Sequence, residues 1–69
     1  MNIKENLEVL QEEIEFQEID EIIKRLNNNE NISSEEIKKF LQNLEDKFSL
    51  SVEYFSTEFF EAKKYLENY

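Results

Sequence analysis

Ile32-Ser33-Ser34-Glu35-Glu36-Ile37 carries the clearest structural signal in the chain, because it holds two signatures of a helix start. With Ser33 as the N-cap residue, Glu36 falls at position N3, and the pair forms a capping box. Ile32 and Ile37 then occupy positions N′ and N4, where two apolar side chains form a hydrophobic staple. Both signatures mark the same boundary, so a helix is predicted to begin directly after Ser33.

The residues on either side of this boundary predict a middle helix and the loop before it. Downstream, apolar residues recur at helical spacing and predict a helix over 34–48; they are Ile37, Phe40, Leu41, Leu44 and Phe48. Upstream lies the polar stretch 27–31, Asn-Asn-Asn-Glu-Asn, whose residues favour turns. This stretch is predicted to be the loop that follows a first helix.

The first segment, 2–27, contains two apolar stripes that conflict. One stripe consists of Ile3, Leu7, Leu10 and Ile14, and the other of Phe16, Ile19, Ile23 and Leu26. At about 100° per residue the two stripes lie roughly 150° apart around a helix, so one straight helix cannot bury both against the same neighbour. The helix either breaks near residues 15–18, bends around the bundle, or stays continuous with its first half facing another partner. The absence of Gly and Pro favours a continuous helix.

The stretch 48–54 fits two kinds of structure. Alternating apolar residues are typical of a half-buried strand; they are Phe48, Leu50, Val52 and Tyr54. A helical spacing also runs through this region and beyond it, along Val52, Phe55, Phe59, Ala62 and Leu66. A strand needs a partner strand, which no other segment offers, so a helix is predicted over 51–68. The competing boundary has Ser56 as N-cap, with Phe55 and Phe60 as staple, and leaves 49–55 extended.

Composition supports an all-α fold. The 69 residues include no Gly and no Pro, whereas tight antiparallel hairpins depend on Gly-containing turns. Glu, Lys, Leu and Gln are abundant and favour helix. We therefore predict a single helical domain over 1–69, with helices over 2–27, 34–48 and 51–68. Its architecture is expected to be a small three-helix bundle, or a helical hairpin with a long first helix.

A core of this size usually needs an additional source of stability. The chain has no Cys for a disulfide and neither Cys nor His for a zinc site. Self-association or binding to a partner is the remaining route, so a homodimer is an alternative to a monomer. The contact is expected to use the first stripe, Ile3, Leu7, Leu10 and Ile14.

Several kinds of chemistry are disfavoured by the residues that the chain lacks. Without His it has neither the Glu-x-x-His pairs of di-metal bundles nor a His base for a serine nucleophile. A calcium loop laid from Asn27 has no Gly at its sixth position and Lys38 in place of the bidentate Glu. A phosphate-binding loop requires glycines. We therefore expect no enzymatic activity, no cofactor and no metal.

Negative charge is concentrated at the start of the chain. The first 21 residues hold eight acidic residues and one basic residue, or −7 of the net charge of −9. Steps of 3, 4 and 3 place Glu5, Glu8, Glu12 and Glu15 in a row opposite the first stripe. Like charges at this spacing repel by a few tenths of a kcal/mol per pair. The row is either a solvated face or a binding surface for a basic protein.

Aromatic residues are concentrated at the other end, with seven of the nine in the last 22 residues. On a continuous helix Tyr54 and Tyr65 adjoin the core face, and Phe60 points away from it. These residues either cover the edge of the core with their hydroxyls in water or form a binding surface. Tyr54, Phe60 and Tyr65 therefore join the acidic row as candidate partner-binding residues.

The leading functional expectation is a small acidic protein that binds and inhibits or masks a larger basic protein. In composition the chain resembles immunity proteins, antitoxins, and anti-restriction and anti-CRISPR inhibitors, which implies a larger and often basic partner. The acidic row would suit a basic surface that normally holds nucleic-acid phosphates, so a partner that handles nucleic acid is one expectation. Direct nucleic-acid binding is not expected, because it requires Lys and Arg. The alternative is a self-assembling structural or adaptor protein. With no long apolar run and no signal-peptide pattern, the chain is expected to be soluble and cytoplasmic, with no membrane partner.

Overall fold

The helix start at Ser33 is confirmed in the computed structural model, which describes residues 2–69. The Ser33 Oγ accepts a hydrogen bond from the Glu36 N–H at 3.1 Å, and Ile32 and Ile37 are both buried. The Glu36 carboxylate accepts a bond from Arg25 Nη1 at 2.5 Å, so it ties this helix to the preceding one. Met1, the first residue of the predicted domain 1–69, lies outside the described residues.

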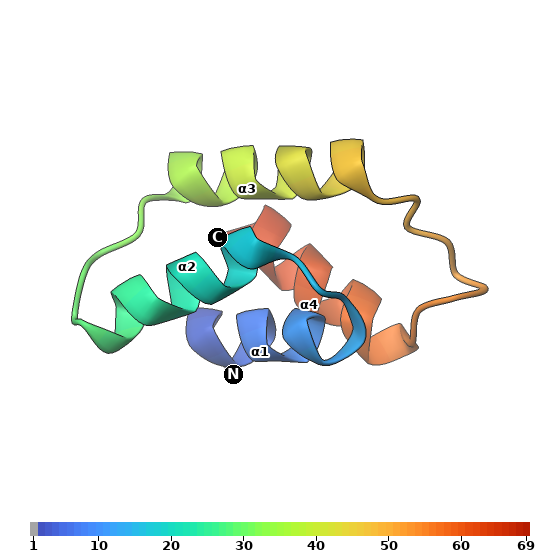
Figure 1. The fold of residues 1–69 in the computed structure, drawn as a ribbon, viewed down its shortest axis with the longest axis horizontal. Helices are drawn as coiled ribbons and strands as arrows, with labels where there is room; N and C mark the ends of the chain where they lie inside the picture. Colours follow the sequence, from blue (N-terminus) through green and yellow to red (C-terminus); the bar gives the residue numbers. More distant parts are fainter. Residues whose placement is uncertain (1) are drawn as a thin grey trace.

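Over residues 2–69 the fold is all-α, as predicted, but with four helices instead of three (Figure 1). Their bounds are α1, Ile3–Glu13; α2, Gln17–Asn27; α3, Ser34–Lys47; and α4, Thr57–Glu67. The difference arises because the predicted long first helix is two helices. The predicted last helix is also shorter, beginning at Thr57 instead of residue 51.

The first helix breaks at Ile14–Phe16, so the prediction of a continuous helix is wrong. Ile14 and Phe16 have extended backbone angles, which any residue can adopt without Gly or Pro. Both side chains are buried, with 8% and 7% of their surface exposed. The break therefore removes the conflict between the stripes, since α1 buries Leu7 and Leu10 while α2 independently buries Ile19.

The second boundary, at Ser56, follows the competing interpretation. The Ser56 Oγ accepts a hydrogen bond from the Phe59 N–H at 3.2 Å, which caps α4. Residues 48–56 form a connection that turns where the Tyr54 N–H donates to the Ser51 carbonyl at 3.0 Å. The continuous helix over 51–68 is therefore wrong, and so is a strand at 48–54.

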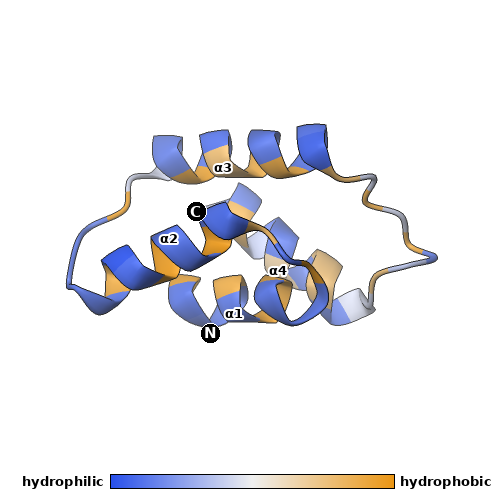
Figure 2. Cartoon of the chain, in the orientation of Figure 1, coloured by the Kyte–Doolittle hydropathy of each residue, from blue (hydrophilic) through white to orange (hydrophobic). Residues whose placement is uncertain are grey.

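The core is built from side chains of all four helices and of the connections between them. α1 packs against α4, which runs in the opposite direction, and against α2, while α3 packs against α4 (Figure 1). The apolar side of α3 faces the other helices (Figure 2). The largest fully buried side chains are those of Leu7, Leu10, Ile19, Ile37, Leu44, Phe59 and Leu66. Phe16, in the α1–α2 connection, stacks on Phe40 of α3 with ring centroids 5.9 Å apart.

Candidate protein-interaction site

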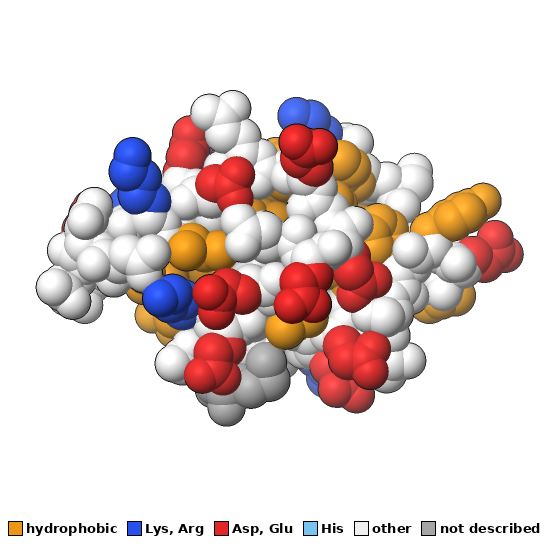
Figure 3. Space-filling view, turned by 60° about the horizontal axis from the view of Figure 1, so that its bottom comes forward, with side chains coloured by type: hydrophobic (Ala, Val, Ile, Leu, Met, Phe, Trp, Pro, Cys, Tyr) orange, Lys and Arg blue, Asp and Glu red, His pale blue; other side chains and the backbone are white. Residues whose placement is uncertain are grey.

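Three of the four residues of the predicted acidic row share the exposed face of α1. Glu5, Glu8 and Glu12 are all exposed on this helix. Glu15 is exposed too, but it lies in the extended connection after α1 and does not continue the row along the helix. Carboxylates spread over the face of the molecule shown in Figure 3, with apolar atoms between them. The ion pairs of the described residues use other carboxylates, those of Glu30, Glu36, Glu45 and Glu67.

Contacts on the two flanks of α1 show which way the row faces. On one flank the Gln11 amide donates to the Asp20 carboxylate of α2. On the other flank Glu13 accepts a hydrogen bond from the Ser56 N–H at the start of α4, at 2.8 Å. At about 100° per residue, Glu5 and Glu12 lie within roughly 60° of Val9, on its solvent side. Glu5 and Glu12 therefore border the α4 side of α1, whereas Glu8, about 100° from Val9, lies farther round the exposed face.

A shallow groove of about 400 Å³ separates α1 from α4 on this side. Its lining consists of Asn6 and Val9 from α1 and of Glu58, Glu61, Ala62 and Tyr65 from α4. We call it the α1/α4 groove. Ala62 is buried, Val9 is half-buried and Tyr65 is 40% exposed, so apolar atoms are accessible in it. The Asn6 side chain is buried and donates to the Asn2 carbonyl at 2.7 Å.

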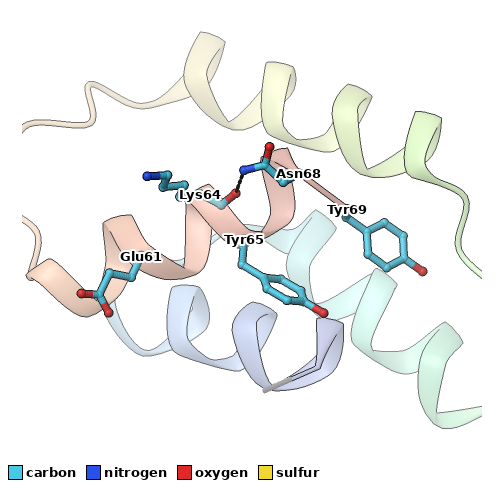
Figure 4. Close-up of a pocket in the computed structure, with 5 residues that line it drawn as sticks. All are labelled: Glu61, Lys64, Tyr65, Asn68 and Tyr69. Atoms are coloured by element: carbon cyan, nitrogen blue, oxygen red, sulfur yellow. Dashed lines mark hydrogen bonds between the residues drawn. The ribbon is translucent and has the colours of Figure 1, made fainter.

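A second hollow lies at the C-terminal end of α4 (Figure 4). In Figure 4 the Tyr65 ring points toward α1 and the Tyr69 ring toward α2. The Tyr69 hydroxyl donates to the Ile32 carbonyl at 3.0 Å, and the Asn68 amide donates to the Lys64 carbonyl at 2.9 Å. Glu61 and Tyr65 line both this hollow and the α1/α4 groove, so these two residues form the boundary between them.

The three predicted aromatic residues occupy different environments. Tyr54 is 79% exposed in the connection before α4, beside Val52, which is 81% exposed. Tyr65 lies near the opposite end of α4. The expectation that Phe60 points away from the core is wrong, because Phe60 is half-buried and packs edge-on against Phe59, with ring centroids 5.4 Å apart. The helix begins later than predicted, which leaves Phe55 free to fold over both rings.

The predicted self-association stripe lies inside the chain. Leu7, Leu10 and Ile14 belong to the buried core, and Ile3 packs against it. A continuous first helix would leave this stripe free for another chain, whereas the break after α1 lets α1 turn this face inward. Dimerisation stays a prediction, but a contact through these residues would require the domain to open.

The charged residues that shift one another's pKa values lie away from the α1/α4 groove. Hydrogen bonds from Arg25 lower the pKa of Glu36, while those to Glu36 and Glu30 raise the pKa of Arg25. Burial lowers the pKa of Lys63, but its hydrogen bonds to Glu45 and Glu67 outweigh this effect and raise it overall. The Arg25 pairs hold the loop between α2 and α3 in place, and the Lys63–Glu45 pair holds α3 against α4.

Two further properties bear on the kind of site. Within residues 2–69, no three His, Cys, Asp or Glu side chains are grouped so that they could hold a metal ion. None of the helices described there combines the length and the apolar character needed to cross a membrane.

Comparisons with protein families, characterised proteins and solved structures found no match to this chain. The exposed surface of the chain is therefore the basis for assigning it a function. Sequence reasoning found the acidic row but missed the α1/α4 groove. One signal was available, since Val9 and Tyr65 are large apolar or aromatic residues outside both predicted stripes.

Proposed function

We propose that this chain is a non-enzymatic protein-binding module that masks a basic surface of a larger protein. The observation that carries the proposal is the exposed carboxylate row of α1, Glu5, Glu8 and Glu12, with Glu15 just beyond it. Like charges at these helical spacings destabilise an isolated helix, so a basic partner would relieve a repulsion that the free protein bears. Such a row also steers a cationic partner toward binding and accelerates association.

The proposed partner is a protein that handles nucleic acid. Surfaces that bind nucleic acid present Lys and Arg toward regularly spaced phosphates. A row of carboxylates along one helix is negatively charged, as phosphates are, and could pair with the same Lys and Arg side chains. The row would compete with the phosphates, which makes inhibition the expected consequence of binding.

Affinity capture followed by a charge-neutralised variant tests the proposal. The tagged chain would be used to capture proteins from host extract, and each purified candidate would be measured by biosensor at increasing salt. We expect a basic partner whose association rate falls with salt, since exposed charges are screened over about 8 Å at physiological ionic strength. Replacing Glu5, Glu8, Glu12 and Glu15 by Gln should weaken binding mainly through association.

A matched control removes the same charge elsewhere. Glu21→Gln, Glu35→Gln, Asp46→Asn and Glu53→Gln change four carboxylates that are exposed away from α1. This control should bind nearly as tightly as the wild type. Equal binding by the α1 variant and the wild type at low salt would refute the proposal.

A self-assembling structural or adaptor role is the second candidate. It is favoured by Val52 and Tyr54, which expose about four-fifths of their surface at neighbouring positions of the 48–56 connection. Exposed apolar side chains of this kind anchor protein contacts. Sedimentation of the wild type and of Val52→Thr with Tyr54→Gln would test it: a wild-type oligomer that dissociates in the variant supports this role, and a monomer at every concentration contradicts it.

A further inference from the structure

The α1/α4 groove has an apolar floor that residues 2–69 leave open. Ala62 is almost fully buried, but its side chain is a single methyl group, and space remains between it and Val9. The Tyr65 ring closes one end of the groove, next to the C-terminal hollow. Partly exposed apolar side chains between two helices form the kind of groove that receives the apolar face of another helix.

Both sides of the groove carry carboxylates. On the α4 side Glu58 and Glu61 line it directly and are exposed. On the α1 side Glu5 and Glu12 border Val9 by helical geometry and are also exposed. Lys63, a basic residue of α4, is turned to α3, where it pairs with Glu45. An apolar floor between two acidic rims is complementary to a segment with apolar residues on one face and basic residues beside them.

We infer that the α1/α4 groove binds an amphipathic basic helix of the partner protein. Apolar side chains of that helix would contact Val9, Ala62 and Tyr65, and its flanking Lys or Arg residues would pair with the four carboxylates. The inference rests on the proposed function and specifies the kind of partner segment. Another copy of this chain is a poorer occupant, because its net charge of −9 would be repelled by the rims.

A synthetic probe tests the groove without knowledge of the partner. The probe is a helical peptide of Leu and Lys, about 14 residues and so about 21 Å long, with all Leu on one face. Its control is a peptide of the same composition in which Leu is spread around the helix. Fluorescence anisotropy should show that the amphipathic peptide binds at least about fivefold more tightly, a difference of about 1 kcal/mol. Equal affinities would overturn the inference.

A pair of matched double variants locates the binding. Val9→Thr with Tyr65→Gln changes the groove, while Val52→Thr with Tyr54→Gln makes the same chemical changes on the 48–56 connection. Neither alters the net charge. The groove variant should lose about fivefold or more in peptide affinity and the control variant less than about twofold. Equal losses, or a larger loss in the control, would overturn the inference.

A measurement on the wild type locates the binding site even if the groove variant fails to fold. Amide NMR shifts on titration with the amphipathic peptide should centre on α1 and α4, around Val9, Ala62 and Tyr65. Shifts confined to α2 and α3 would overturn the inference.

The captured partner separates the inference from the proposed function. If neutralising the α1 carboxylates abolishes its binding and the groove variant binds it normally, the proposed function stands and the groove inference fails. In the opposite outcome, neutralising the α1 carboxylates leaves partner binding unchanged while the groove variant abolishes it. In that case the groove binds a partner for a reason other than charge. That outcome would overturn both the masking function and the basic character assigned to the helix.

Discussion

Glu13, the last residue of α1, accepts a hydrogen bond from the Ser56 N–H at 2.8 Å and another from the Ser56 hydroxyl. The same hydroxyl oxygen accepts a bond from the Phe59 N–H and so caps α4. One carboxylate thereby fixes the start of α4 against the end of α1, across 43 residues of sequence. It sets the spacing of the two helices that enclose the α1/α4 groove.

Glu13→Ala should lower the free energy of unfolding by about 1 kcal/mol, because it removes both bonds to Ser56. Glu15→Ala is the control, since Glu15 is exposed in the connection after α1 and lies outside the helical part of the acidic row. Urea denaturation followed by circular dichroism would measure both variants. If the two have the same midpoint, the contact between Glu13 and Ser56 contributes nothing to stability.

The two serine caps should differ in strength. Ser33→Ala removes the cap of α3 and should cost about 1 kcal/mol, the typical value for an N-cap serine. Ser56→Ala removes the cap of α4 together with the hydroxyl bond to Glu13, so it should cost more. Ser34→Ala, just inside α3, serves as the control. Chemical denaturation of the three variants would reveal the order, and a larger loss for Ser33→Ala would contradict it.

Sequence alone was sufficient where the determining contacts are local. The cap at Ser33 and the staple between Ile32 and Ile37 involve residues at most five positions apart; in the structure the cap is formed and both isoleucines are buried. At Ser56 the local signals allowed two boundaries. The contact that distinguishes them is the bond to Glu13, which depends on the tertiary fold and cannot be recognised from neighbouring residues.

The break after α1 escaped prediction for a similar reason. The conflict between the stripes was visible, but the absence of Gly and Pro favoured a continuous helix. In the structure Ile14 and Phe16 leave the helical conformation and both become buried, and Phe16 gains ring contacts with Phe40 and Phe48. Burial of an aromatic side chain, worth roughly 1.5–3 kcal/mol, is enough to compensate for a few lost helical hydrogen bonds. The α1/α4 groove depends on the same tertiary arrangement, so it too was missed.

The pair between Arg25 and Glu36 should make stability depend on acidic pH. Hydrogen bonding to Arg25 holds the pKa of Glu36 below its ordinary value of 4.5 in the folded chain. Its contribution is therefore present above pH 4.5 and is lost as the pH falls through the folded value. Glu36→Gln should remove part of this dependence of stability on pH. Glu35→Gln leaves the Arg25–Glu36 pair in place, so it should leave the pH dependence unchanged. Thermal unfolding between about pH 3 and 7 would test this, and identical profiles for wild type and Glu36→Gln would contradict it.

Leu7 and Leu10 provide a test of where the first stripe lies. Both are fully buried in the core, so Leu7→Ala should cost about 2–5 kcal/mol, a large share of the stability of a domain this small. Changing both residues to Lys should unfold the chain. Circular dichroism and sedimentation would separate the possibilities. A variant that stays helical but becomes a smaller species would show that the stripe is an intermolecular contact.

Glu8 gives the cleanest measure of what the acidic row costs the free protein. It lies three residues after Glu5 and four before Glu12, so Glu8→Gln removes both repulsive neighbour pairs with one substitution. The substitution is made in a Lys4→Gln parent, because Lys4 lies four residues before Glu8 and would otherwise contribute an attractive pair. Glu5 is a less informative site, because it lies in the first turn of α1, where the helix dipole favours a carboxylate. Glu15 lies beyond the helix, and Glu15→Gln should change stability little. We expect Glu8→Gln to raise the free energy of unfolding by about 0.4–1 kcal/mol at low salt, with the gain shrinking as salt is added. A Glu8→Gln variant that is no more stable than its Lys4→Gln parent would show that the row bears no repulsion for a basic partner to relieve.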